Sequence, residues 1–172
     1  MLDVLTGCSS LTSGDMKVDM LYAGQGMHTT NEIELNLQLL DFITQTLILI
    51  TDAHMEITDE SHMYVPCGNE IEVALMKFLT HIDVPIHDKL VEREKEFTRY
   101  AMFPFDPFRG TRTVAYSYFQ RDEQATVIVI CMGNPEKIVP KCVAELDKNY
   151  ETVAFDGYGY QGEEYLKYTI SD

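Results

Sequence analysis

Three stretches in the second half of the chain decide the fold: FTRYAMFPF (97–105), RTVAYSYF (112–119) and ATVIVIC (125–131). Each is rich in aromatic and β-branched residues, which fit the pleated surface of a sheet. The polar run QRDEQ (120–124) predicts a turn between the last two stretches. Consecutive strands joined by turns of this kind pair side by side, so this part of the chain predicts an antiparallel sheet.

Helices are predicted on either side of these strands. Apolar residues recur at helical spacing between residues 32 and 51, after a first strand at 16–22 and before a loop or short ribbon at 52–66. A second helix begins at Asn69, which can cap it, with Glu70 and Glu72 in the first turn. Further helices are expected at 88–96, at 134–142 after Asn134-Pro135, and at 163–169.

This order of elements predicts an α+β fold rather than alternating βαβ units. We expect one twisted antiparallel sheet containing 16–22, 97–105, 112–119 and 125–132. Helices near 35–50, 70–79 and 134–142 should cover it. The two commonest nucleotide-binding signatures, G-x-G-x-x-G and G-x-x-x-x-G-K-[ST], are absent from the sequence.

Composition narrows the classes of function. The chain has 172 residues, 45% of them hydrophobic, which suits one domain, or at most one and a fraction, with a real core. Its formal net charge of −15 excludes a typical nucleic-acid binder, because such proteins need a basic surface for the phosphate backbone. An anionic ligand would therefore require the few cations to gather at its site.

The cysteines and the apolar runs indicate a reducing environment and no membrane contact. Cys8, Cys67, Cys131 and Cys142 form no C-x-x-C pair and no spacing typical of zinc, so we expect no metal site. Scattered cysteines of this kind fit the cytosol. The most apolar run, 35–50, is shorter than a membrane span, and polar residues interrupt it.

Four stretches carry a resemblance to a known family. They are LTSGDMKV (11–18), CGNEIEVAL (67–75), FPF (103–105) followed by TV (113–114), and CMGNPE (131–136). In this order they resemble motifs of the nucleotide-binding domain of P-type cation-transporting ATPases, most closely the type II calcium and sodium/potassium pumps. Residues 1–15 would then be the remnant of a junction with the phosphorylation domain, and 16–172 the nucleotide-binding domain.

The resemblance implies a site for ATP, carried with Mg²⁺ in the full-length protein. Its residues would be Glu72, Phe105, Arg109, Arg112, Met132 and Gly133. Phe105 would stack on the adenine, Glu72 would bind the adenine edge, and the arginines would face the phosphates. Gly133 would let the backbone approach the ligand.

From the residues alone, these side chains have ordinary interpretations as well. Phe105 could belong to the core, Glu72 could simply complement the helix dipole, and the arginines could be surface charges.

The sequence also departs from the family pattern. The phosphorylated aspartate of the family falls at Thr6 and the following lysine at Gly7, and threonine cannot form an aspartyl-phosphate. Met132 and Gly110 stand where lysines are expected. Two explanations remain open. If the chain is an excised domain, only the departures at Thr6 and Gly7 are explained. If its parent is a degenerate pump, the departures at Met132 and Gly110 are explained as well.

The expected function is to present ATP to the phosphorylation domain at the cytoplasmic face of a membrane. Partners would be the phosphorylation and actuator domains of the same parent chain, with no nucleic acid. No residue of this chain is expected to be catalytic, so the isolated chain should be inactive. The alternative is a degenerate pseudo-ATPase domain that binds nucleotide weakly or not at all and serves as a structural or regulatory interaction module.

Overall fold

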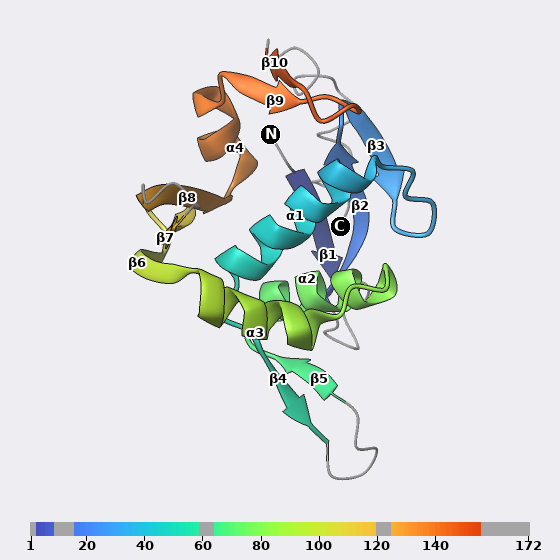
Figure 1. Ribbon diagram of the computed structural model, residues 1–172. Coiled ribbons are helices and arrows are strands. Elements are labelled where there is room, and N and C mark those ends of the chain that lie inside the picture. The colour runs from blue at the N-terminus through green and yellow to red at the C-terminus, as the bar shows by residue number, and fades with distance from the viewer. Residues whose placement is uncertain (1–2, 9–15, 59–63, 120–124, 156–172) are drawn as a thin grey trace.

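Figure 1 shows the computed structural model, which describes residues 3–8, 16–58, 64–119 and 125–155. Its helices are α1 (Leu37–Ile50), α2 (Glu70–His81), α3 (Ile86–Glu96), the short α4 (Pro135–Ile138) and the 3₁₀ turn η1 (Val139–Lys141). Its strands are β1 (Asp3–Cys8), β2 (Met16–Ala23), β3 (Gly26–Thr29), β4 (His54–Ile57), β5 (Tyr64–Cys67), β6 (Thr98–Asp106), β7 (Thr111–Phe119), β8 (Ala125–Gly133), β9 (Ala144–Leu146) and β10 (Thr152–Ala154). The α+β prediction is confirmed.

The three stretches at 97–131 form one antiparallel sheet in the order β6-β7-β8. Side chains alternate across β8: Ile128 and Ile130 are partly buried, whereas Val127 and Val129 are 54% and 64% exposed. The covered face packs Val114 and Tyr116 of β7 against Leu49 and Ile50 at the end of α1. α1 therefore covers one face of the sheet. The alternation of partly buried and exposed residues along β8 is the period of two expected of a strand covered on one face.

The strand predicted at 16–22 exists, but it does not belong to this sheet. β2 pairs with β1 and β3 in a separate three-stranded antiparallel sheet. Gly24 and Gln25 adopt positive φ angles of 60° and 65°, which close a tight hairpin between β2 and β3. The expectation of one continuous sheet was wrong, because β2 takes its partners from its own sequence neighbours and leaves the middle strands to pair among themselves.

The main core lies between β2 and the helices. Leu21 of β2, Ile43 of α1 and Met76 and Leu79 of α2 are completely buried there, and Ile86 adds the start of α3. Figure 1 shows α1 crossing the middle of the molecule, with α3 running below it and β6–β8 to one side. A single helix, α1, thus joins the main core to the β6–β8 sheet.

The helix ends follow their capping residues. Asn36 caps α1, accepting the Gln38 amide at 2.8 Å, so the helix begins later than the periodicity suggested. The helix expected at 134–142 is instead α4 followed by η1, because Pro140 has no amide hydrogen with which to continue an α-helix.

The structure tests some of the remaining predictions, and others lie outside the residues that it describes. The region read as a loop or short ribbon is the hairpin of β4 and β5. The charged helix is α3, which begins slightly earlier than predicted, at Ile86. The helix predicted at 163–169, and most of the motif at 11–18, lie outside the described residues.

Candidate functional site

The predicted site residues converge at one end of the β6–β8 sheet. Arg112 of β7 pairs in register with Met132 of β8, and Thr111 pairs with Gly133. Phe103 of β6 pairs with Thr113 and Asp106 with Thr111, so Phe105 lies in an irregular stretch opposite Arg112. Arg109 occupies the turn between β6 and β7, and Glu72 reaches Arg112 from α2.

Glu72 and Arg112 form a buried ion pair. Arg112 Nη1 donates to Glu72 Oε1 at 2.6 Å. Arg112 is only 7% exposed and Glu72 only 3%. The backbone N–H of Asp52 donates to the same Glu72 oxygen at 3.1 Å. The Glu72 carboxylate is therefore satisfied from within the protein.

The ion pair continues as a row of charged side chains toward β6, at the edge of the sheet. Arg112 Nη2 donates to Asp52 Oδ2, and Arg99 Nη2 of β6 lies 2.9 Å from Asp52 Oδ1. Arg99 also donates through Nε to the Tyr116 hydroxyl at 3.2 Å and lies over that ring. Alternating charges thus connect α2, the segment that follows α1, β7 and β6.

Breaking such a network is costly. Removing one partner of a buried pair typically destabilises a protein by about 3–5 kcal/mol, because the other charge is left uncompensated. The Glu72–Arg112 pair therefore stabilises the packing of α2 beside β7.

The N-terminus of α2 is built to hold Glu72 in place. Asn69 caps the helix, its Oδ1 accepting the Glu72 amide at 2.9 Å. Gly68 leaves room beside the carboxylate: a Cβ there would lie 2.9 Å from Ala53 Cβ and 3.3 Å from Glu72 Oε2. A larger residue at position 68 would therefore crowd Ala53 and approach the second carboxylate oxygen of Glu72.

Phe105 is not a core residue. It is 51% exposed, as is its neighbour Phe103 at 52%, and Phe108 in the following turn is 97% exposed. Half-exposed aromatic rings on one strand leave an apolar face in contact with water, which a flat ligand could cover. The structure therefore excludes the interpretation of Phe105 as core.

Arg109 is half exposed and anchored by a neighbour. Its Nε donates to Asp106 Oδ2 at 2.9 Å, and the Phe108 amide donates to Asp106 Oδ1 at 2.9 Å. The Phe108 amide, together with the Arg109 amide and guanidinium, holds the pKa of Asp106 below its ordinary value. The turn thus keeps a guanidinium near the sheet end with part of its surface open to solvent.

The surroundings of Met132 and Gly133 explain why these residue types fit at the two positions. Met132 is partly buried and packs against both hydrophobic clusters. A Cβ on Gly133 would lie 2.1 Å from the Gly110 carbonyl oxygen, so no other residue fits there without a backbone shift. Gly110, with φ of +65°, closes the turn and accepts the Asn134 amide at 2.8 Å.

Asp52, Arg99 and Asn69 are members of this site that sequence analysis did not single out as site residues. Asp52 lies 60 residues from Arg112, so no local pattern connects them. The sequence feature that indicated this network was Arg112 itself. A cation at the start of a strand otherwise rich in apolar and aromatic residues needs a buried acidic partner.

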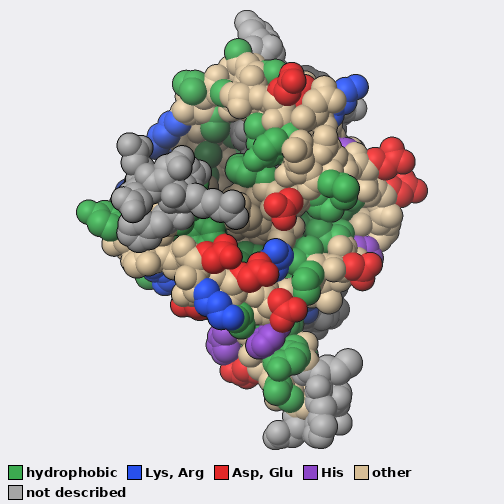
Figure 2. Space-filling view, in the orientation of Figure 1, with side chains coloured by type: hydrophobic (Ala, Val, Ile, Leu, Met, Phe, Trp, Pro, Cys, Tyr) green, Lys and Arg blue, Asp and Glu red, His purple; other side chains and the backbone are tan. Residues whose placement is uncertain are grey.

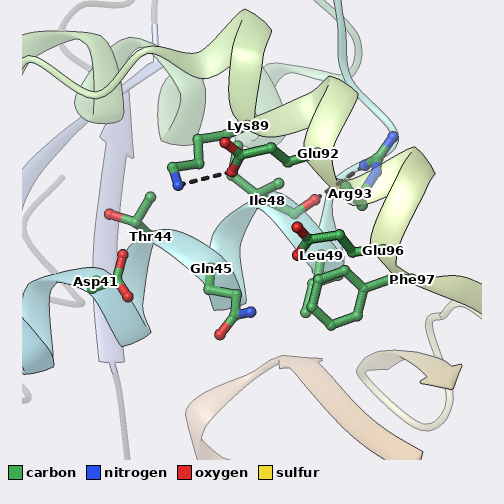
Figure 3. A pocket seen from close by; sticks show the side chains of 10 residues that line it. All are labelled: Asp41, Thr44, Gln45, Ile48, Leu49, Lys89, Glu92, Arg93, Glu96 and Phe97. Atoms are coloured by element: carbon green, nitrogen blue, oxygen red, sulfur yellow. Dashed lines mark hydrogen bonds and ion pairs between the residues drawn. The ribbon is translucent and has the colours of Figure 1, made fainter. Parts of the chain in front are cut away.

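One pocket formed by the described residues lies away from the predicted site residues. A pocket of about 120 Å³ between α1 and α3 is lined partly by Asp41, Lys89, Glu92 and Arg93. Figure 3 shows Lys89 paired with Glu92, and Arg93 reaching the carbonyl of Ile48. Arg93 also binds the Thr51 carbonyl at 2.9 Å, so it neutralises the C-terminal end of α1.

The surface in this area carries charges of both signs, which alternate over α3 in Figure 2. None of the predicted site residues lines the pocket between α1 and α3. Across the described ranges, no group of His, Cys, Asp or Glu side chains is arranged to hold a metal ion. Within the same part of the chain, every helix is too short or too polar to cross a bilayer.

Comparison with known proteins gives one family match. The family model for the P-type ATPase cytoplasmic domain N matches residues 40–157. This range runs from within α1 past β10 and contains every predicted site residue. No curated protein sequence matches the chain.

Proposed function

Because the chain belongs to the family of P-type ATPase cytoplasmic N domains, we propose that it is an adenine-nucleotide-binding domain of a cation-transporting pump, of the type II class. It would lie at the cytoplasmic face of a membrane and present ATP, with Mg²⁺, to the phosphorylation domain of its parent chain. The actuator domain would be its other partner. The family supports a nucleotide-binding role in general.

The observation that carries the proposal is the exposed ring of Phe105 on β6, followed in the next turn by an accessible guanidinium. Phe105 is 51% exposed on β6, and the Arg109 side chain is 56% exposed in the turn that follows. A base stacked on the ring would place its phosphates within reach of that turn. Stacking and charge neutralisation are the contributions that a positioning domain makes to phosphoryl transfer.

The remaining residues have supporting roles in this proposal. Arg112 and Glu72 hold β7 and α2 together and leave the phosphates to Arg109. Since Arg112 is engaged and Met132 is uncharged, few cations remain to oppose the net charge of −15. We therefore expect weak binding, with a Kd of about 1 mM, or about −4 kcal/mol.

The buried Glu72–Arg112 pair favours a second candidate from another class. If Phe105 is covered by a protein partner rather than by a base, the chain is a pseudo-ATPase interaction module. Its exposed aromatic rings, Phe103, Phe105 and Phe108, would then be contacts for that partner.

Titration of the ¹⁵N-labelled chain with ATP and ADP separates the two candidates. ATP should shift the amides around Phe105 and Arg109 in a saturable way. Phe105→Ala should abolish these shifts, while Phe103→Ala, an equally exposed phenylalanine on the same strand, should leave the Kd within about twofold. Spectra of both variants report whether the fold is kept. If several millimolar ATP moves no resonance, the interaction module is the better description.

A further inference from the structure

β8 forms one edge of the β6–β8 sheet. In the described part of the chain it pairs only with β7, and this pairing runs along the whole strand without a register shift. On both faces the side chains of β8 are more exposed than their neighbours on β7. Val129 is 64% exposed and Ala115 opposite it 9%, while Ile130 is partly buried and Val114 opposite it completely buried. Among the described strands, none covers the outer backbone groups of β8.

The opposite edge of the sheet carries features that prevent further strand pairing. β6 contains the charged Arg99 and also Pro104, which has no amide hydrogen to donate. Its pairing with β7 shifts register twice, which bends the edge.

β8 has none of these protections. Its sequence, ATVIVICMG (125–133), contains no proline and no acidic or basic residue. The other edge strands among the described residues are shorter: β1 has six residues and a register shift, and β3, β4, β5, β9 and β10 have three or four. A long, flat, apolar edge of this kind is a template for pairing with a further strand.

The sequence of β8 is complementary to itself. In an antiparallel pairing about a two-fold axis at Val129, this residue faces its own copy, and Val127 faces the second copy's Cys131 on the same face. On the other face Ile128 lies opposite the second copy's Ile130. All five central positions of the strand then meet an apolar side chain, and such cross-strand pairs are what stabilise an antiparallel pairing.

Charge also favours this strand as the contact between two copies. Each chain carries a formal net charge of −15, so two copies repel each other over most of their surface. Contact through a strand without acidic or basic residues places no like charges opposite each other. Salt screens the repulsion that remains, so association should strengthen as the salt concentration rises.

We propose that β8 is a dimerisation strand: two copies of the chain pair their β8 strands antiparallel about Val129. The product is one continuous sheet in the order β6-β7-β8-β8-β7-β6. Its outer edges are the two β6 strands, whose bulges, proline and charge stop further addition, so the assembly closes at two copies. This proposal does not depend on nucleotide binding.

Sedimentation equilibrium of the whole chain measures the association. At about 0.1 mM protein the weight-average mass should approach twice the 19.7 kDa of the chain, more closely in about 0.5 M than in about 0.05 M sodium chloride. Val129→Lys places a charge in the middle of the edge and should leave the protein monomeric. Val143→Lys is the matched control, because Val143 is 84% exposed between η1 and β9, and the same charge change there should leave the dimer intact. Circular dichroism reports whether both variants are folded.

A cross-link tests the register. In Val127→Cys the new thiol lies opposite the second copy's Cys131, at a Cα separation of about 4.5–5.5 Å that permits a disulfide. Within one copy the two positions are about 14 Å apart along the strand, too far to bridge. Oxidised glutathione, which takes up the two electrons and two protons of the thiols, should therefore convert this variant into a covalent dimer. Val143→Cys, and Val127→Cys combined with Cys131→Ser, should run as monomers on a non-reducing gel.

Several results would overturn the proposal. The chain could stay monomeric at about 0.1 mM in both salt concentrations, in which case β8 would fit only a strand of a different protein. Equal masses for Val129→Lys and Val143→Lys would show that the copies meet at another surface. Should Val129→Lys unfold, the cross-link decides: a covalent dimer that requires Cys131 supports the register, and one that persists with Cys131→Ser contradicts it.

Discussion

At the scale of single residues, Arg112 stabilises one end of the β6–β8 sheet by binding two acidic side chains. Arg112→Ala leaves Glu72 and Asp52 without their shared cation, so we expect the free energy of unfolding to fall by about 3–5 kcal/mol. Urea unfolding followed by circular dichroism measures the change. Arg109→Ala, which removes an exposed arginine from the neighbouring turn, should leave the midpoint almost unchanged. Equal losses in the two variants would contradict the importance of the buried pair.

Gly133 tests the close approach of β8 to the β6–β7 turn. In Gly133→Ala the new Cβ meets the Gly110 carbonyl oxygen, so the strands must separate, at a cost of about 3 kcal/mol. Gly26→Ala is the control, because its Cβ would meet its nearest neighbour, His28 Nε2, at an ordinary 3.5 Å. Thermal unfolding of the two variants gives the comparison. A Gly133→Ala protein as stable as the Gly26→Ala protein would show that this end of the sheet is loosely packed.

Asp106 gives the β6–β7 turn a pH dependence. Because the amides of Phe108 and Arg109 bind its carboxylate, its pKa in the folded state lies below the unfolded value of about 3.9. The contribution of the carboxylate to stability is therefore complete above the unfolded pKa and is lost as the pH falls through the folded pKa. NMR titration of the side-chain carboxyl should show a midpoint below the ordinary range. A midpoint at or above about 4 would contradict the hydrogen bonds.

At the scale of elements, the start of α2 determines where Glu72 lies. Asn69→Ala removes the cap that binds the Glu72 amide and should destabilise the protein by about 1 kcal/mol. Asn134→Ala is the matched control, since Asn134 precedes α4 but its side chain makes no capping hydrogen bond. Chemical denaturation should therefore separate the two variants. A larger effect of Asn134→Ala would mean that α4, rather than α2, is the element limited by its cap.

At the scale of the whole molecule, the net charge of −15 acts against the folded state. Sodium chloride screens this repulsion, so the melting temperature at pH 7 should rise by a few degrees on going from about 0.01 M to about 0.15 M salt. The rise should shrink near the sequence pI of about 4.6, where the net charge approaches zero. A fall in melting temperature with added salt at pH 7 would show that specific ion pairs outweigh the overall repulsion.

The local pattern was sufficient to predict many of the elements and the family. The β-branched runs at 97–131 became β6, β7 and β8, and Asn69 capped α2 where the sequence placed it. These features depend on neighbours within a few residues, which determine strand propensity, capping and turns. The motifs that resemble P-type ATPases are also local, and the family match over residues 40–157 confirms the N-domain assignment.

Only the tertiary structure decided which elements pair and what each charged side chain binds. The turn residues that follow Met16–Ala23 do not show whether this strand also joins the central sheet. Likewise, Glu72, Arg112 and Asp52 come from three distant segments, and their pairing arises only when α2 packs beside β7. Burial made the difference, because charges removed from water must find each other, and the ion pair of Glu72 with Arg112 follows from it.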